Sequence, residues 1–170
     1  MYNTLIRNIF RFLILFIMQI LVFDNIRFGN YIHPNIYVLF IMLLPFDVTR
    51  ANLVIYGFLM GMMIDIFSGT PGLNAAATVF MAFFRPNIIN LTSRKSDIED
   101  KNAPTITEMG LQWFAIYGIL LLLLHNLVLF WLEAFSVKLL GVVILETLIS
   151  APTSLLIIIL IIYMFKPIKK

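Results

Sequence analysis

The side chains of this sequence that could take part in chemistry are few, and most stand alone among apolar residues. Asp65 lies in the stretch GFLMGMMIDIFSGTPGLNAAA, just before a turn rich in Gly and Pro. A carboxylate there could cap the turn at a membrane surface, or it could bind a partner or a ligand. Its position at the end of an apolar segment favours capping. Gly57, Gly61 and Asp65 are each four residues apart, which places all three on one face of a helix.

Small residues at this spacing let another helix approach closely, and within one chain they favour internal packing over dimerisation. Pro71 and Gly72 suit a tight reversal of the chain after Asp65. Beyond the turn, Asn74 and Thr78 share one face of the next helix. The sequence therefore predicts a close-packed helical hairpin with polar groups at its tip.

The remaining buried candidates are isolated. His125 and Asn126 are adjacent, so we expect them to point to different faces of their helix. No other metal-ligand side chain lies beside His125 at a suitable spacing, which favours a hydrogen-bonded interior histidine over a metal ligand. Glu146 is predicted to be the deepest acid, costly in a membrane unless it is paired or faces water. An acid or base role for Glu146 or Asp65 would need a substrate site that the sequence does not reveal.

The motif inventory argues against an enzyme. The sequence has no GxSxG or HExxH motif, no phosphate-binding glycine loop and no arginine ladder. It has no cysteine, which excludes disulfides and thiolate metal sites. A net charge of +3 does not indicate nucleic-acid binding. We therefore predict a non-enzymatic protein without a cofactor, a metal or a nucleic-acid partner.

These residues must be positioned by membrane-spanning helices. Hydrophobic residues make up 61% of the chain and charged residues 12%, against roughly 45–50% and 25% in soluble domains. The apolar residues form long runs, which are typical of membrane spans. The sequence predicts an all-α, polytopic integral membrane protein with one transmembrane domain, residues 1–170. Six spans are expected, at about 9–23, 36–46, 53–67, 73–91, 109–132 and 137–165, with a polar loop at about 92–108.

The basic residues predict the orientation. If all six segments cross, every Lys and Arg except Arg27 and Lys138 lies on one side, which is the cytoplasmic side by the positive-inside rule. Both termini are then cytoplasmic, and the protein is expected in the inner membrane of a bacterium, in contact with lipid. The segment 36–46 is the weak point, because it is too short for a bilayer core of roughly 30 Å. We predict a short span there, and a broken or buried short helix is the alternative.

The order of these motifs resembles a known family. Gln19 in the first span is followed by Pro34-Asn35 at the start of the short segment, then by Gly57-xxx-Gly61-xxx-Asp65. The turn Pro71-Gly72 with Asn74 completes the series, which covers roughly residues 19–86. In order and spacing this resembles MreD, the bacterial rod-shape-determining membrane protein. His125 and Glu146 match no motif of that family.

The resemblance implies a bundle of six helices, similar in fold to the substrate-binding subunits of energy-coupling-factor vitamin transporters. It also implies partners: an MreC-like protein with a single transmembrane helix and, indirectly, an MreB-like filament and a RodA-type glycosyltransferase with its transpeptidase. The first hypothesis is therefore a scaffold subunit of the cell-elongation complex (the elongasome), which supports cell shape and side-wall peptidoglycan synthesis. The alternative is a transporter subunit that binds a small vitamin-like molecule. Nine candidate residues for shape or partner contact follow: Gln19, Pro34, Asn35, Gly57, Gly61, Asp65, Pro71, Gly72 and Asn74.

Overall fold

The computed structural model describes residues 2–25 and 32–165, and within these ranges it contains helices and no strand. The all-α prediction is therefore confirmed for the described residues. Five helices are long: α1 (Tyr2–Met18), α3 (Arg50–Ser68), α4 (Leu73–Thr92), α7 (Leu111–Ala134) and α8 (Leu140–Met164). The short elements are a π-helical turn (Gln19–Phe23) that continues α1, α2 (Leu39–Met42), α5 (Lys95–Ile98), α6 (Ile106–Met109) and a 3-10 turn (Val137–Leu139).

Within the described ranges, four helical stretches are long and apolar enough to cross a membrane: Ile6–Phe23, Arg50–Ser68, Leu111–Ala134 and Val137–Met164. Their outward side chains are large and apolar, as at Ile9, Phe58 and Leu148. A soluble surface rarely carries so much contiguous apolar area, whereas a lipid-facing surface requires it. The structure therefore supports a membrane protein.

The predicted span at 73–91 corresponds to α4, which is as long as α3 but more polar. Helix α4 packs between α3 and α7. Its polar residues Asn74, Thr78 and Arg85 are buried against protein. Because neighbouring helices rather than lipid cover this part of its surface, α4 has less need for a uniformly apolar sequence.

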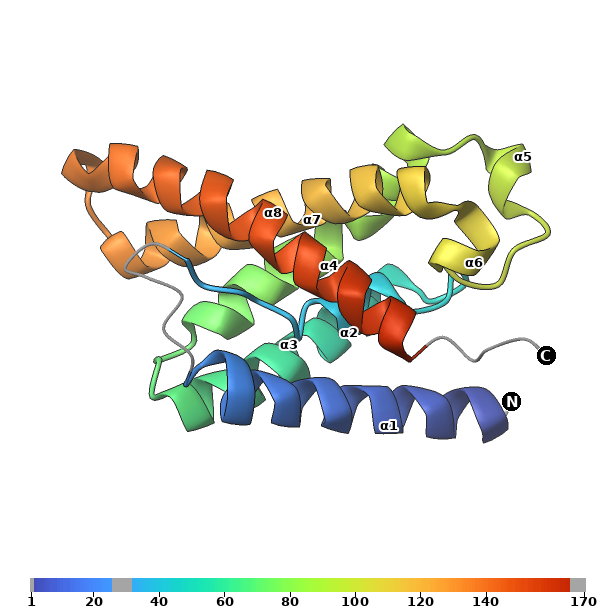
Figure 1. Ribbon diagram of the computed structural model, residues 1–170, viewed down its shortest axis with the longest axis horizontal. Helices are drawn as coiled ribbons and strands as arrows, with labels where there is room; N and C mark the ends of the chain where they lie inside the picture. The colour runs from blue at the N-terminus through green and yellow to red at the C-terminus, as the bar shows by residue number, and fades with distance from the viewer. Residues whose placement is uncertain (1, 26–31, 166–170) are drawn as a thin grey trace.

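The prediction of a helical span at 36–46 is wrong, and the alternative of a broken, buried helix is what the structure contains. Only Leu39–Met42 is α-helical, and residues 34–44 are buried throughout. We call residues 32–46 the crossing segment, because they run lengthwise through the middle of the bundle (Figure 1). Pro34 and Pro45 bracket this stretch, and a residue that precedes proline is disfavoured in a helix, so few positions remain for helical turns.

Figure 1 shows how the elements divide between the two ends of the molecule. The start of α1, the end of α8 and both short helices α5 and α6 lie at one end, which we call the basic end after Arg7, Arg50 and Lys101. The α3–α4 turn and the α7–α8 connection lie at the other, the turn end. The loop predicted at 92–108 thus contains two short helices, α5 and α6.

Helices α3 and α4 form the predicted hairpin, and glycines set their spacing. A Cβ atom on Gly61 would lie 2.5 Å from the Cα atom of Ala75 and 2.6 Å from the carbonyl oxygen of Asn74. A Cβ atom on Gly57 would lie 3.1 Å from the Cβ atom of Ala82. The glycine face of α3 is therefore covered by α4, which confirms the prediction of internal packing. Gly69 and Gly72 form the turn with positive φ angles of 70° and 82°.

Replacing Gly61 with alanine is expected to destabilise the protein by about 1–3 kcal/mol, because the new methyl group would overlap the backbone of α4. Gly141, which also lies in a helix, is the matched control, since nothing lies within 4 Å of a Cβ atom placed on it. Gly141→Ala should be neutral or stabilise the helix by up to about 1 kcal/mol. The midpoint of thermal unfolding in detergent measures both variants. Equal midpoints would contradict the close-packing assignment.

Candidate functional site

Asp65 lies at the end of α3 and is only 4% exposed. Its Oδ1 atom accepts hydrogen bonds from the Thr70 hydroxyl (2.6 Å) and from the backbone N–H and side-chain amide of Asn74 (3.0 Å each). Its Oδ2 atom accepts the backbone N–H of Ala75 at 2.9 Å. These N–H groups belong to the first turn of α4 and have no partner within that helix. The carboxylate thus caps α4 from the preceding helix, where the helix dipole favours negative charge.

Asn74 continues the network toward the middle of the bundle. Its amide nitrogen donates to Asp65 and to the Thr70 oxygen (3.0 Å), so its Oδ1 atom must face the other way. The Tyr37 hydroxyl donates to that oxygen at 2.9 Å. Tyr37 belongs to the crossing segment, so this bond joins the tip of the hairpin to the centre of the molecule.

The Tyr37 hydroxyl determines which ring nitrogen of His125 carries the proton. His125 lies on α7 and is fully buried. Tyr37 has one proton, which it gives to Asn74, so it accepts from His125 Nε2 at 2.8 Å. A doubly protonated ring would be an unpaired buried charge, because no carboxylate contacts it. His125 is therefore neutral, with the proton on Nε2 and a lone pair on Nδ1.

The His125 Nδ1 atom lies 3.1 Å from the side-chain amide of Asn126, which in turn contacts the amide of Asn35 at 3.0 Å. A lone pair requires a donor, so the Asn126 group that faces His125 is the NH₂, and the Asn35 group that faces Asn126 is the oxygen. This assignment gives partners to the Asn126 amide nitrogen, and the Asn126 oxygen then takes the buried position at which no partner lies among the described residues. The amides then form one continuous chain from α7 to the crossing segment.

Gln19 holds the first part of the crossing segment. Its Oε1 atom accepts the backbone N–H groups of Ile36 (2.8 Å) and Tyr37 (3.4 Å), and its Nε2 atom donates to the Pro34 carbonyl (3.1 Å). From α8, the Ser154 hydroxyl accepts the N–H of Asn35 at 3.0 Å. Side-chain oxygens thus take up the N–H groups that precede the short helix α2, which have no helical partner.

Arg85 holds the other end of the crossing segment and is only 1% exposed. Its guanidinium group donates to the carbonyl oxygen of Leu44, more weakly to that of Pro45 (3.5 Å), and to the hydroxyl of Tyr117 (2.9 Å). The Tyr117 hydroxyl donates in turn to the Met42 carbonyl at 3.0 Å. These carbonyls lie at and beyond the carboxyl end of α2, where a cation is favoured.

The structure brings together most of the predicted candidates. Gln19, Pro34 and Asn35 meet at the start of the crossing segment, and Asp65 and Asn74 join them through Tyr37. The remaining four have other roles: Gly57 and Gly61 set the helix spacing, while Pro71 and Gly72 shape the turn and form no bond in the network.

The expectation for Glu146 is wrong, whereas that for His125 and Asn126 is incomplete. His125 and Asn126 are adjacent on α7, yet both are buried and their side chains contact each other. Adjacent helical residues are only about 100° apart, so a helix packed on several sides can bury both. Glu146 is partly exposed and lies in the second turn of α8, near the turn end rather than in the middle of a span.

Sequence reasoning missed Tyr37, Tyr117 and the inward direction of Arg85. The two tyrosines lie in apolar runs and look like packing residues. Arg85 was placed among the cytoplasmic basic residues. The signal that could have indicated its role is its position within an otherwise apolar stretch, seven residues before the loop at 92–108 begins.

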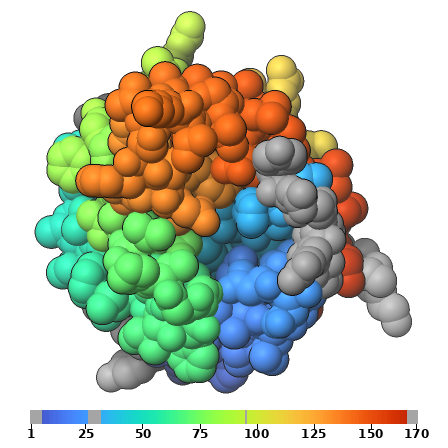
Figure 2. Space-filling view, turned by 90° about the vertical axis from the view of Figure 1, so that its left-hand side faces the viewer, coloured from blue at the N-terminus to red at the C-terminus, as the bar shows by residue number. Residues whose placement is uncertain are grey.

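A cavity of about 530 Å³ opens next to this network at the turn end. Gln19, Asn35 and Asn74 line it on the inside, and Asp24 and Glu133 lie on its walls. Figure 2 looks onto this end and shows the crossing segment in a recess between α1, the α3–α4 turn and the α7–α8 connection.

The arrangement is suited to holding a shape rather than to moving protons. The Asp65 carboxylate accepts four bonds from protein donors, and the Arg85 guanidinium bonds three oxygens. Neither group is left open to a substrate. A group that is occupied in this way is a poor general acid or base, because catalysis requires access to the proton of the substrate.

Gln19→Leu should remove the bonds to the crossing segment and leave buried N–H and carbonyl groups unpaired, at a cost of about 1–3 kcal/mol for each group. The expected result is a large fall in the thermal unfolding midpoint. Gln112 on α7 is the matched control, since it is exposed, and Gln112→Leu should leave the midpoint nearly unchanged. Comparable losses in the two variants would refute the role of Gln19.

The proton assignment of His125 can be read directly by ¹⁵N NMR of imidazole-labelled protein. The sequence has two histidines, so His33→Gln, at an exposed position, isolates the His125 signals. We expect Nε2 to resonate as a protonated nitrogen and Nδ1 as an unprotonated one. The opposite pattern would mean that Tyr37 donates to His125 rather than to Asn74.

Comparison with known proteins identifies no relative. No protein-family model, no curated protein and no solved structure matches this chain. The family that the motifs resemble therefore stays a prediction, and the case for a function rests on the residues described above.

Proposed function

We propose that this chain is a non-enzymatic scaffold subunit of a bacterial cell-elongation complex, similar to MreD. In this proposal the chain crosses the inner membrane six times, with α4 and the crossing segment as the two crossings that protein shields from lipid. Both chain ends and the loop with α5 and α6 face the cytoplasm, in agreement with the positive-inside rule. The protein acts by presenting a fixed surface to the transmembrane helix of an MreC-like partner.

The observation that carries this proposal is that the residues of the MreD-like motif series hold the bundle together in the structure. Gln19 holds the crossing segment, the Asn35 side chain joins that segment to α7 through Asn126, and Asp65 and Asn74 tie it to the hairpin. Gly61 sets the spacing within that hairpin. The motif series is thus a set of structural determinants, as a scaffold needs, because each polar member bonds other parts of the protein.

The structure also narrows where a partner could bind. Gly57, Gly61 and Asp65 are covered by α4 or buried, so a partner helix cannot touch them. They would act on the partner only by shaping the bundle. Contact would be made by the outward apolar faces, for example at Phe58 on α3 or Leu148 on α8, which are about half exposed.

The test is purification of the tagged protein from its native membrane after photo-crosslinking, with mass spectrometry of the captured proteins. A photoreactive residue is placed at Phe58 or at Leu148, and at the fully buried Met60 as the control. We expect one of the two exposed positions, and not Met60, to capture a one-helix MreC-like protein together with wall-synthesis enzymes. Capture of ATP-hydrolysing subunits and their membrane coupler instead would overturn the scaffold proposal.

The second candidate is a transporter subunit that binds a small polar molecule, and the cavity at the turn end favours it. Its inner wall carries the amides of Gln19, Asn35 and Asn74, and pockets of several hundred Å³ with a few polar groups are typical of small-ligand sites. Against it, these amides already bond the protein. A small molecule that co-purifies with the wild type but not with Asn35→Leu would establish this candidate.

A further inference from the structure

An apolar slot of about 610 Å³ lies between α1 and the last turns of α8. Ile14 and Met18 form its wall on α1, Ile161 and Ile162 form the wall on α8, and Leu43 of the crossing segment lies at its floor. We call it the α1–α8 slot. Because its lining is apolar and the surrounding helices are membrane spans, the natural occupant is a hydrocarbon chain rather than water.

The polar end of this slot carries two cations and no acid. Among the described residues that line the slot, only Arg7 and Arg11 are charged, and they stand on the same face of α1 as Ile14 and Met18. Arg11 is partly buried and donates one hydrogen bond, from Nη1 to the Leu43 carbonyl at 3.2 Å. Neither arginine forms an ion pair with a carboxylate among the described residues. Most of their N–H donors are therefore free for an anion.

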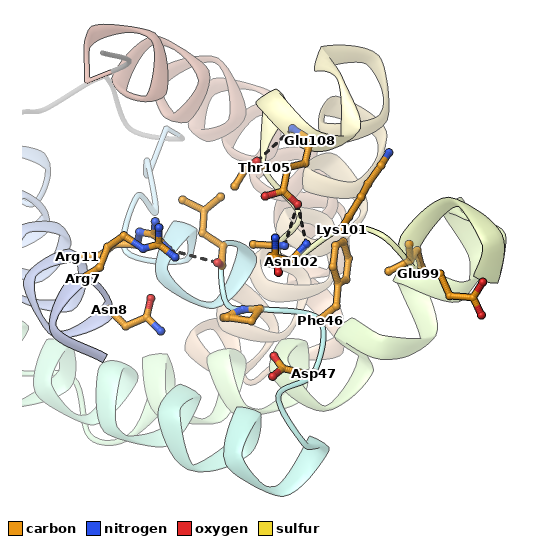
Figure 3. Close-up of a pocket in the computed structure, with 14 residues that line it drawn as sticks. Arg7, Asn8, Arg11, Phe46, Asp47, Glu99, Lys101, Asn102, Thr105 and Glu108 are labelled. Carbon is orange, nitrogen blue, oxygen red and sulfur yellow. Dashed lines mark hydrogen bonds between the residues drawn. The ribbon is translucent and has the colours of Figure 1, made fainter. Parts of the chain in front are cut away.

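The two arginines also border a second cavity, of about 690 Å³, at the basic end. Figure 3 shows Arg7 and Arg11 extending from α1 on one side and Lys101 and Glu108 on the opposite side. The Glu108 carboxylate is turned to its own loop, where it accepts the N–H groups of Asn102 (2.8 Å) and its neighbour in sequence (3.1 Å). Asp47 and Glu99 also line this cavity, so its charge is mixed, and the space that suits an anionic headgroup is the part next to the two guanidinium groups.

The dimensions agree with one lipid leaflet. From Arg7 to Met18 the helix rises about 16 Å at 1.5 Å per residue. Half of a bilayer core of roughly 30 Å is about the same length. An acyl chain in the slot would thus reach the middle of the membrane when its phosphate lies at the arginines.

From the slot, its two unpaired arginines and its length, we propose that the protein binds one anionic phospholipid, with an acyl chain in the α1–α8 slot and the phosphate at Arg7 and Arg11. Arginine suits this role because its fork of N–H donors matches phosphate oxygens. The bound lipid would fill the gap between the first and last long helices. This inference does not depend on whether the chain is a scaffold or a transporter subunit.

The experiment is native mass spectrometry of the full-length protein in nanodiscs made from equal parts of phosphatidylglycerol and phosphatidylcholine. We expect one phosphatidylglycerol to stay bound after release, at least tenfold in excess over phosphatidylcholine. Arg7→Gln with Arg11→Gln should abolish this preference. Arg94→Gln is the charge control, because Arg94 is exposed at the same end but does not line the slot. Equal loss in the Arg94 variant would mean general surface attraction and would overturn the proposal.

The apolar part of the site is tested separately, at residues that form no hydrogen bond. Ile14 and Ile17 are 47% and 49% exposed on α1, but only Ile14 lines the slot. Ile14→Trp should fill the slot and reduce lipid retention severalfold, whereas Ile17→Trp should not. If both variants keep the lipid to the same extent, the acyl chain does not lie in the slot. Unchanged thermal unfolding midpoints in both variants would show that the fold is intact.

Discussion

The structure depends on one constraint: a non-helical stretch of backbone in an apolar interior must find hydrogen-bond partners outside itself. The crossing segment contains only one turn of helix, so side chains of other elements have to replace the missing backbone bonds. Each backbone group meets a side chain of the opposite hydrogen-bonding type. Oxygen acceptors from Gln19 and Ser154 meet the N–H groups before α2, and donors from Arg85 and Tyr117 meet the carbonyls at and beyond its end.

This constraint also explains why polar residues occur in such an apolar chain. Asp65, Asn74 and Tyr37 connect the tip of the hairpin to the crossing segment, and His125 continues the connection to α7. Each group uses its hydrogen-bonding capacity on the protein. A buried network in which all but one amide atom, on Asn126, is bonded makes one arrangement of the helices much more favourable than others. Rigidity of this kind would suit the proposed scaffold, which has to offer a constant surface to its partner.

The sequence was sufficient for the parts of the fold that depend on local patterns. Apolar runs predicted the long helices, the spacing of Gly57 and Gly61 predicted close packing, and Asp65 before a Gly–Pro turn predicted a cap. The sequence was insufficient where hydrogen bonds between residues far apart in the chain determine the local structure. Pro34 and Pro45 limit helix formation locally, but nothing local shows which groups bond the non-helical backbone of residues 36–46, because those partners lie far away in the chain. The direction of the Arg85 side chain could not be predicted for the same reason, since its carbonyl partners are about forty residues earlier.

Some hydrogen-bond partners of the crossing segment lie more than a hundred residues later in the sequence, which affects when the centre of the bundle can form. Ser150 and Ser154 bond the backbone of residues 117 and 119 positions earlier in the chain, and they belong to the last long helix. A ribosome that has produced α1, the crossing segment and the α3–α4 hairpin has therefore not yet supplied the hydroxyls that complete the centre. Until α8 is made, the N–H groups of His33 and Asn35 lack these two partners. The final set of bonds to the crossing segment can therefore form only after the last long helix has been synthesised.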